Sequence, residues 1–310
     1  MNKCLYCYDK IDGEAHFHPG CSKKIFGSVT PPIIDFTEVH LEGLAAKLIE
    51  SQSGITGVQA KLSLNIQKVR GEVKKLTIVD YYGGYILKPQ SSTYENLPEL
   101  EDLCMKMAKK SGVAVVPHSL IRLKSDQLAY ITKRIDRDKV GKIPMEDMCQ
   151  LTERLTEHKY RGSHEQIAKV IFKFSENPLY DVQRFYEQVL FSYLIGNSDM
   201  HLKNFSIFKD KKLGYGLTPA YDMLSSLLVT NDNVELALTI NGKQNRIKLN
   251  DFRISMANSG IKENVVEKIF KRFSQLQASW FELIDKSFLP VDKQVKFKVM
   301  IQQKLSNLNL

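Results

Sequence analysis

The side chains best suited to chemistry lie between residues 194 and 222, where carboxylate and amide groups follow one another closely. Asp199 and Asn204 are separated by four residues, and Lys203 directly precedes Asn204. This spacing is typical of phosphoryl-transfer sites, in which the carboxylate accepts a proton from the attacking hydroxyl and the amide oxygen binds Mg²⁺. Lys203 could neutralise charge on the transferring phosphoryl group. Because isolated matches of this kind are common in turns, the interpretation depends on the neighbouring segments.

A second carboxylate follows after a predicted β-hairpin. The segments NFSIF (204–208) and LGYGLT (213–218) flank a DKK turn, and the chain then reaches Asp222. Mg²⁺ is usually held by one or two carboxylates together with phosphate oxygens and water. We therefore predict that Asn204 and Asp222 hold Mg²⁺ while Asp199 acts as the catalytic base.

Two upstream features fit a nucleotide site. Lys88 ends an apolar strand-like segment, and residues 97–110 show helical spacing, with Glu99 or Glu101 as the lysine's partner. Gly54 and Gly57 bracket a turn in which backbone N–H groups could approach phosphate. The same glycines fit a plain β-turn, and Lys88 could simply extend to solvent. The order of all these motifs along the chain favours an ATP site.

Secondary-structure patterns divide the chain. Alternating apolar and polar residues before residue 133 predict strands, whereas helical periodicity dominates afterwards. We expect an α+β fold of the bilobal, protein-kinase-like kind, with a sheet-rich N-lobe (31–133), a helical C-lobe (134–310) and a Cys/His-rich start (1–30). The predicted helices are 41–50, 97–110, 145–157, 164–175, 181–195, 262–285 and 292–307.

From about residue 50 to 226 the chain resembles the HipA-like toxin kinases of bacterial toxin–antitoxin systems. The motifs that carry the resemblance are GVQAK (57–61), ILKP (86–89), RIDR (134–137), EDMCQ (146–150), GNSDMHLKNFS (196–206) and LTPAYD (217–222). The resemblance implies an ATP- and Mg²⁺-dependent serine/threonine protein kinase that stops translation by phosphorylating an aminoacyl-tRNA synthetase. Because little chain precedes the first motif, the sequence is similar to the short toxin HipT of HipBST systems, which suggests the tryptophanyl enzyme by analogy.

The resemblance also implies residue roles. The backbone from Thr56 to Lys61 would cradle phosphates, Lys88 would contact them, the backbone of Lys133 and Ile135 would read adenine, and His201 would lie near the nucleotide. The implied phosphate-binding loop contains Thr56, Gly57, Val58, Gln59 and Lys61. Two positions depart from the family pattern. Gly54 stands where a self-phosphorylated serine is usual, which leaves Thr56 and Ser53 as autophosphorylation candidates, or no such reaction. Ile135 replaces the usual aromatic residue of the hinge.

The family implies protein partners: a DNA-binding HipB-like antitoxin and a small HipS-like protein that supplies a separate N-terminal subdomain. We expect no direct sequence-specific DNA binding, since no helix carries clustered base-reading side chains. Two alternatives remain open. One is a small-molecule phosphotransferase of the aminoglycoside type, and the other is a non-catalytic nucleotide-binding module.

The length, charge and cysteine content of the chain indicate which partners and which compartment are compatible with it. The chain has 310 residues and a net charge of +9, which suits polyanionic partners but also serves solubility alone. Its five cysteines are odd in number and unevenly placed, which argues against a secreted disulfide scaffold. No apolar segment is long enough to span a bilayer or to act as a signal core. We therefore expect a cytoplasmic protein without membrane contact, and leave open its export into another cell.

The N-terminal segment has a second chemical signature. Cys4 and Cys7 form a C-x-x-C pair, and His18 and Cys21 form an H-x-x-C pair. Such a set could close a tetrahedral, structural Zn²⁺ site. Alternatively, the thiols are reduced and packed against neighbouring aromatic rings.

Overall fold

The computed structural model describes residues 2–37, 40, 41, 43, 60–67, 73–79, 83–138, 141–230 and 233–310. The chain divides into two compact units. The first unit comprises Met1–Leu103, Val116–Lys139 and Lys286–Leu289, and the second comprises Cys104–Val115, Val140–Asp285 and Pro290–Leu310.

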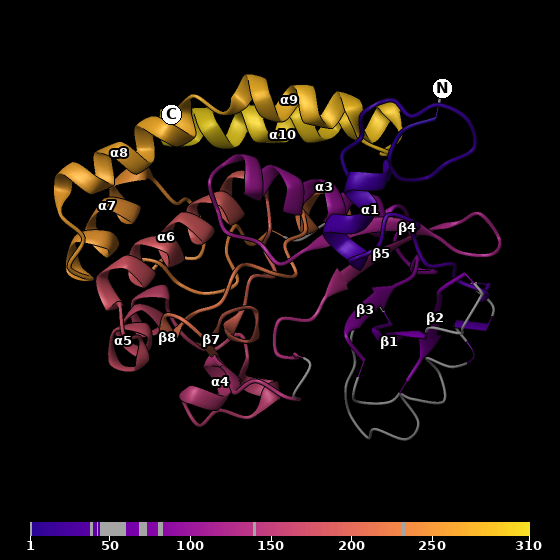
Figure 1. The fold of residues 1–310 in the computed structure, drawn as a ribbon. Helices are drawn as coiled ribbons and strands as arrows, with labels where there is room; N and C mark the ends of the chain where they lie inside the picture. The colour runs from indigo at the N-terminus through magenta and orange to yellow at the C-terminus, as the bar shows by residue number, and fades with distance from the viewer. Residues whose placement is uncertain are drawn as a thin grey trace. The chain divides into compact units, whose positions relative to one another are not determined.

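The first unit is built on a five-stranded antiparallel sheet with the order β2-β1-β3-β5-β4. The strands are β1 (Leu62–Gln67), β2 (Lys75–Ile78), β3 (Tyr85–Lys88), β4 (His118–Arg122) and β5 (Leu128–Lys133) (Figure 1). Leu62 and Leu64 of β1 are buried, as the period-two pattern predicts for one face of a sheet. On β3 the last two residues, Leu87 and Lys88, are both buried, and Lys88 pairs with Tyr130 of β5.

Helix α1 (Pro19–Phe26) precedes the strands of this sheet in the sequence, and helix α3 (Leu97–Lys110) lies between β3 and β4. Helix α1 has proline in its first turn and ends at Gly27, which adopts the left-handed conformation that glycine tolerates. Helix α3 begins in the first unit and ends in the second. The residues of the helical stripe expected from the sequence are all buried: Leu97, Leu100, Leu103, Cys104 and Met107. Burial extends beyond this stripe, to Pro98, Glu101, Asp102, Met105 and Ala108.

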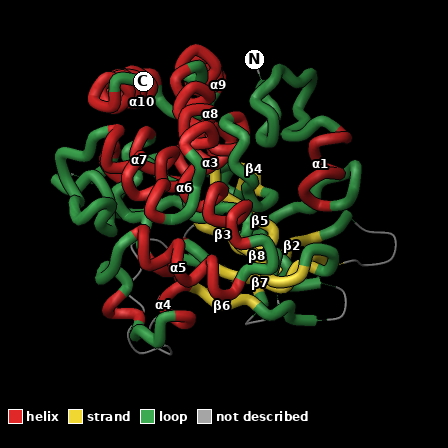
Figure 2. The backbone as a smooth tube through the Cα atoms, turned by 90° about the vertical axis from the view of Figure 1, so that its left-hand side faces the viewer, coloured by secondary structure: helices red, strands yellow, loops and turns green. Residues whose placement is uncertain are grey.

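The second unit is mainly helical (Figure 2). Its α-helices are α4 (Met148–Leu151), α5 (His164–Phe174), α6 (Pro178–Leu194), α7 (Leu249–Asn258), α8 (Glu263–Ser274), α9 (Gln277–Lys286) and α10 (Val291–Leu308). A three-stranded antiparallel sheet has the order β6 (Met145–Asp147), β7 (Ser206–Asp210) and β8 (Gly214–Leu217). Among the described residues, no helix is both long and apolar enough to cross a membrane.

Several sequence-based expectations need correction. The predicted helix 145–157 is wrong at its start, because β6 pairs with β7 and Asp147 then caps the four-residue helix α4. A single-turn 3-10 helix, Thr156–His158, follows. The predicted helix 262–285 is two helices, α8 and α9. Helices α1 and α7 were not predicted, and most of the predicted helix 41–50 lies outside the described residues.

Helix α6 fixes the end of β8 through a buried carboxylate. Asp181 is 3% exposed, and its side chain accepts hydrogen bonds from Ser175 Oγ (2.6 Å), Leu217 N–H (2.8 Å) and Arg184 Nη1 (2.8 Å). Arg184 also donates to the carbonyl oxygens of Leu217 and Thr218. Since Leu217 ends β8, these bonds set the point from which the chain continues toward Asp222.

We expect Asp181→Ala to destabilise the protein by about 3–5 kcal/mol, because it removes a buried carboxylate that accepts three hydrogen bonds and leaves the partly buried Arg184 without its ion-pair partner. Urea unfolding followed by the fluorescence of Trp280, the single tryptophan, measures this change. The matched control is Asp285→Ala, which breaks the surface ion pair with Lys298 and should cost less than about 1 kcal/mol. Equal losses in both variants would contradict the role assigned to Asp181.

Candidate functional site

The segment after α6 presents Asp199 to solvent. Asp199 is exposed, although its neighbours Ser198 and Met200 are buried. Its Oδ1 accepts a hydrogen bond of 2.6 Å from the hydroxyl of Tyr160, and its backbone N–H donates to Asn197 Oδ1 (3.3 Å). The carboxylate is thus held in place while remaining accessible to a substrate.

Asn204 and Asp222 meet in the same unit. Asn204 ends the 3-10 helix Leu202–Asn204, and its Nδ2 lies 3.4 Å from Asp222 Oδ2. Asn204 Oδ1 accepts the His201 N–H at 2.9 Å, which occupies one of its two lone pairs. Two oxygen-bearing side chains separated by 18 positions in the sequence are therefore within hydrogen-bonding distance.

The backbone around Asp222 is fixed on both sides. Asp222 has φ +60°, a left-handed conformation that costs most non-glycine residues energy and often marks functional sites. The preceding Tyr221 exchanges a 2.6 Å hydrogen bond with Ser206 Oγ and donates to the Lys203 carbonyl (3.1 Å). One carboxylate and one amide, both oxygen donors, form a set that suits Mg²⁺.

Lys203 has a partner that the sequence analysis missed. Its Nζ lies 2.6 Å from Asp147 Oδ2, and its side chain is 34% exposed. Asp147 also caps α4, since it accepts the Gln150 N–H. The Lys203 ammonium group is therefore held in place by a carboxylate at the end of β6.

His201 is buried and neutral at neutral pH. Burial lowers its pKa to about 4, although the nearby Asp199 acts in the opposite direction. Its ring lies edge-on to that of Tyr160, with 5.1 Å between centroids. A neutral imidazole can take part in hydrogen bonds at this position but adds no positive charge.

The first unit contributes a buried ion pair. Lys88 Nζ lies 2.6 Å and 2.8 Å from the two carboxylate oxygens of Glu101 on α3, and the two residues are 5% and 2% exposed. Of the two acidic candidates, the structure therefore places Glu101 at the Lys88 ammonium. The ammonium also lies 5.5 Å from the centroid of the Tyr130 ring, a favourable cation–π distance.

Three other predicted nucleotide contacts can be located in the first unit. Lys61 is exposed immediately before β1, Lys133 ends β5 with an exposed side chain, and Ile135 is half-buried. The N–H groups of Lys133 and Arg134 already donate to the carbonyl oxygens of Pro117 and Gly84. These two N–H groups are therefore not available to donate hydrogen bonds to an adenine ring. The remaining predicted loop positions lie outside the described residues: Ser53, Thr56, Gly57, Val58 and Gln59.

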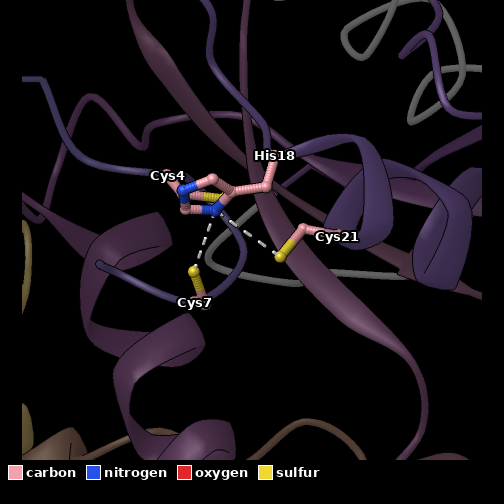
Figure 3. A group of neighbouring side chains, drawn as sticks. All are labelled: Cys4, Cys7, His18 and Cys21. Atoms are coloured by element: carbon pink, nitrogen blue, oxygen red, sulfur yellow. Dashed lines mark hydrogen bonds between the residues drawn. The ribbon is translucent and has the colours of Figure 1, made fainter. Parts of the chain in front are cut away.

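All four N-terminal candidates come together in the first unit (Figure 3). The thiol sulfurs of Cys4, Cys7 and Cys21 and one nitrogen of His18 lie within 4.8 Å of one another. This cluster shares no residue with the features described above.

A comparison with protein families decides the classification. The sequence model of the HipA-like C-terminal domain matches residues 53–280, which is more than two thirds of the chain. The chain belongs to this family. The match includes Lys88, Asp199, Asn204 and Asp222, and it begins after the cysteine-rich segment.

Individual relatives of this HipA-like chain carry kinase names. A Haemophilus influenzae protein named "Putative kinase" is 28% identical over 265 residues, covering 76% of each sequence. Two further relatives from Sinorhizobium fredii, Y4dM and Y4mE, are 32% and 29% identical. The alignments cover 45% and 48% of their lengths, so the chain spans about half of each.

Solved structures establish the fold. The HipA chain of a Shewanella oneidensis MR-1 toxin–antitoxin complex with HipB and operator DNA matches with a TM-score of 0.68 at 21% identity, over 83% of this chain and 65% of that chain. The Helicobacter pylori proinflammatory kinase CtkA matches with a TM-score of 0.54 at 14% identity, over 72% and 87%. The HipA-like chain therefore has a protein-kinase-like α+β fold, as predicted.

Sequence reasoning missed Tyr160 and Asp147 and left Glu101 undecided. A signal for Glu101 was present, because it is four residues after Leu97 and three before Cys104 on the buried face of α3. Tyr160 and Asp147 contact residues 39 and 56 positions away, so no local spacing could have identified them.

A second buried histidine supports the loop of this HipA-like chain. His164, at the start of α5, is 1% exposed and packs against Phe205, the residue after Asn204, and Phe185. Complete burial lowers its pKa to about 4. Between this value and the ordinary pKa of about 6.5, the unfolded chain binds a proton that the folded chain does not. The contribution of His164 to stability is therefore fully present above pH 6.5 and falls as the pH drops toward 4.

We predict that His164 lowers the free energy of unfolding by about 2 kcal/mol between pH 7.5 and pH 5. His164→Phe, which keeps a ring of similar size, should remove this part of the acid sensitivity. Urea unfolding of both proteins at the two pH values measures it, with pH 7.5 as the internal reference. An unchanged pH dependence in the variant would show that His164 is not responsible.

Proposed function

We propose that this protein is an ATP- and Mg²⁺-dependent serine/threonine protein kinase. The observation that carries the proposal is the arrangement in the second unit, where exposed Asp199 follows α6 and Asn204 contacts Asp222. These groups provide a base and a cation-binding pair, which phosphoryl transfer requires. The kinase names of the relatives point in the same direction.

In this proposal, each residue has one task. Asp199 accepts the proton of the substrate hydroxyl at its carboxylate, and the Tyr160 hydroxyl keeps that carboxylate oriented. Asn204 and Asp222 hold Mg²⁺, which when bound offsets the negative charge of the phosphate oxygens. Lys203 balances negative charge at the loop, and Asp147 positions its ammonium group.

The nucleotide contacts of the proposal lie in the first unit. Lys88 binds phosphate oxygens as a point charge, and Glu101 holds the ammonium in place. The phosphate-binding loop is assigned to Thr56, Gly57, Val58, Gln59 and Lys61. The adenine contact is assigned to Ile135, because the neighbouring Lys133 N–H is already used within the sheet.

We assign the kinase the role of a toxin in a toxin–antitoxin system. The support is membership of the HipA-like family and the likeness to a HipA chain that was solved together with HipB and operator DNA. The partners proposed are a HipB-like DNA-binding protein and a small HipS-like protein. The substrate proposed is an aminoacyl-tRNA synthetase, by analogy the tryptophanyl enzyme, which places the reaction in the cytoplasm.

The deciding assay is incubation of the purified protein with labelled ATP and Mg²⁺, alone and with a bacterial lysate. We expect Asp199→Asn to lower phosphate transfer by about 10²–10⁴-fold through loss of the general base. Asp222→Ala should lower it at least as much, because it removes the carboxylate of the cation site. Asp210→Asn, an isosteric change at the hairpin turn, serves as the control and should retain activity.

Circular dichroism melting of each variant separates a lost activity from a lost fold. Labelled serine or threonine in a lysate protein supports the kinase, whereas transfer to a small hydroxylated molecule would favour the aminoglycoside-type alternative. Nucleotide binding without any transfer would favour a non-catalytic module. Mass spectrometry of the protein itself tests Thr56 and Ser53 as autophosphorylation sites.

A second prediction uses the two acidic residues of α3. Glu101→Gln should weaken ATP binding about tenfold or more, because the neutral amide no longer holds the Lys88 ammonium by a charge-assisted pair. Glu99→Gln is the matched control, since Glu99 lies on the same helix and its carboxylate accepts a hydrogen bond from Asn96. Isothermal titration calorimetry with a non-hydrolysable ATP analogue measures both affinities. Equal weakening in the two variants would contradict the assignment of Glu101.

A further inference from the structure

The cysteine-rich segment has the geometry of a closed tetrahedral metal site. His18 Nδ1 lies 3.4 Å from Cys7 Sγ and 3.9 Å from Cys21 Sγ, and all four ligand atoms lie within 4.8 Å of one another (Figure 3). Tetrahedral Zn²⁺ with bonds of about 2.0–2.3 Å places its ligand atoms roughly 3.3–3.8 Å apart. Small shifts of the side chains would therefore enclose one ion.

The orientation of His18 supports a metal rather than simple packing. Its Nε2 lies 3.0 Å from the carbonyl oxygen of Lys10. Because a carbonyl oxygen can only accept, Nε2 carries the hydrogen, and the lone pair of Nδ1 faces the sulfur atoms. Metal-binding histidines commonly donate their second nitrogen to a carbonyl in this way.

The backbone fixes the cysteines as firmly as the histidine. In the turn that carries Cys4 and Cys7, Tyr8 N–H donates to the Cys4 carbonyl and Cys4 N–H donates to Asp9, both at 2.9 Å. Tyr8 has φ +68°, which closes the turn. His18 precedes helix α1 and Cys21 lies within its first turn. A tight turn and a helix start thus present two ligands each.

The cluster is joined to the Lys88–Glu101 pair by contacts within the first unit. Tyr8, one residue after Cys7, donates a buried hydrogen bond of 2.6 Å to Asp102, the neighbour of Glu101 on α3. On its other side Asp102 lies 3.8 Å from His118, whose ring stacks on Tyr130. The Tyr130 ring in turn lies 5.5 Å from the Lys88 ammonium.

We propose that Cys4, Cys7, His18 and Cys21 bind one structural Zn²⁺ ion and that this ion, through Tyr8, braces helix α3 at the Lys88–Glu101 pair. The three thiols lose their protons as the metal binds. With four protein ligands the site has no open position, so its role is structural and not catalytic. Metal binding does not depend on the proposed kinase activity, and neither does the test of the brace.

The first test is elemental analysis of protein purified without a histidine tag. We expect about one zinc per chain in the wild type. His18→Ala and Cys7→Ser should lose it. His16→Ala is the matched control, because His16 lies two residues before His18 and is exposed; it should keep the metal. Zinc-free wild-type protein with reduced thiols, or with a Cys4–Cys7 disulfide by mass spectrometry, would overturn the site.

A spectroscopic test covers the case in which the variants fail to fold. Wild-type protein loaded with Co²⁺ should show the intense visible bands of a tetrahedral ion and thiolate-to-cobalt charge-transfer bands in the near ultraviolet. Weak bands of an octahedral ion would contradict the proposed ligand set.

Hydrogen exchange tests the brace without relying on activity. Removing zinc with a chelator should speed amide exchange in α3 and β3 about tenfold, the effect of losing one charge-assisted hydrogen bond. Tyr8→Phe should keep the zinc and show the same faster exchange in α3. Loss of zinc without any change in α3 would overturn the brace and leave the metal site standing.

Discussion

The buried pairing of Lys88 with Glu101 connects a central strand of the first unit to helix α3. A charged lysine that is 5% exposed is tolerable only beside a carboxylate of fixed position. The sheet fixes Lys88 through the register of β3 with β5, and the apolar stripe of α3 fixes Glu101. The same helix carries Asp102, whose carboxylate accepts a hydrogen bond from the Tyr8 hydroxyl. Strand β3 and helix α3 are thus joined by the ion pair, and the N-terminal segment is joined to the same helix by Tyr8.

In the second unit, Asp199 is exposed and yet held in place by its hydrogen bonds. Burial of the residues on either side supplies the rigidity, and Tyr160 restrains the carboxylate from outside. Asp222 reaches Asn204 through a short hairpin whose end is fixed by Asp181 and Arg184 of α6. The left-handed backbone at Asp222 is tolerated because Tyr221 is bonded to Ser206 and Lys203. Local strain and the bonds that offset it lie in adjacent residues.

Whether a feature could be predicted from the sequence depends on how many residues separate the side chains or strands that form it. The Asn204–Asp222 contact was predictable, since a hairpin of known length separates the two residues. The helices α3, α5, α6 and α10 were predictable from long apolar stripes. The region 145–157 was not, because β6 forms only by pairing with β7, some 60 residues later. Tyr160 is the extreme case, since an exposed tyrosine carries no pattern that marks it as the partner of an aspartate.

In the N-terminal segment, the candidate metal ligands can be predicted from the sequence, whereas the part of the fold that they restrain cannot. The spacing of four ligands is local, so the sequence reveals a metal-binding pattern at once. What the pattern cannot reveal is which part of the fold the segment restrains, because that depends on contacts such as Tyr8 with Asp102, 94 positions away. The segment packs Leu5, Tyr8 and Phe17 into the first unit, each of them 5% exposed or less. A metal ion bound as proposed would add a cross-link between the Cys4–Cys7 turn and the start of α1, and Tyr8, next to Cys7, connects that cross-link to α3 through Asp102.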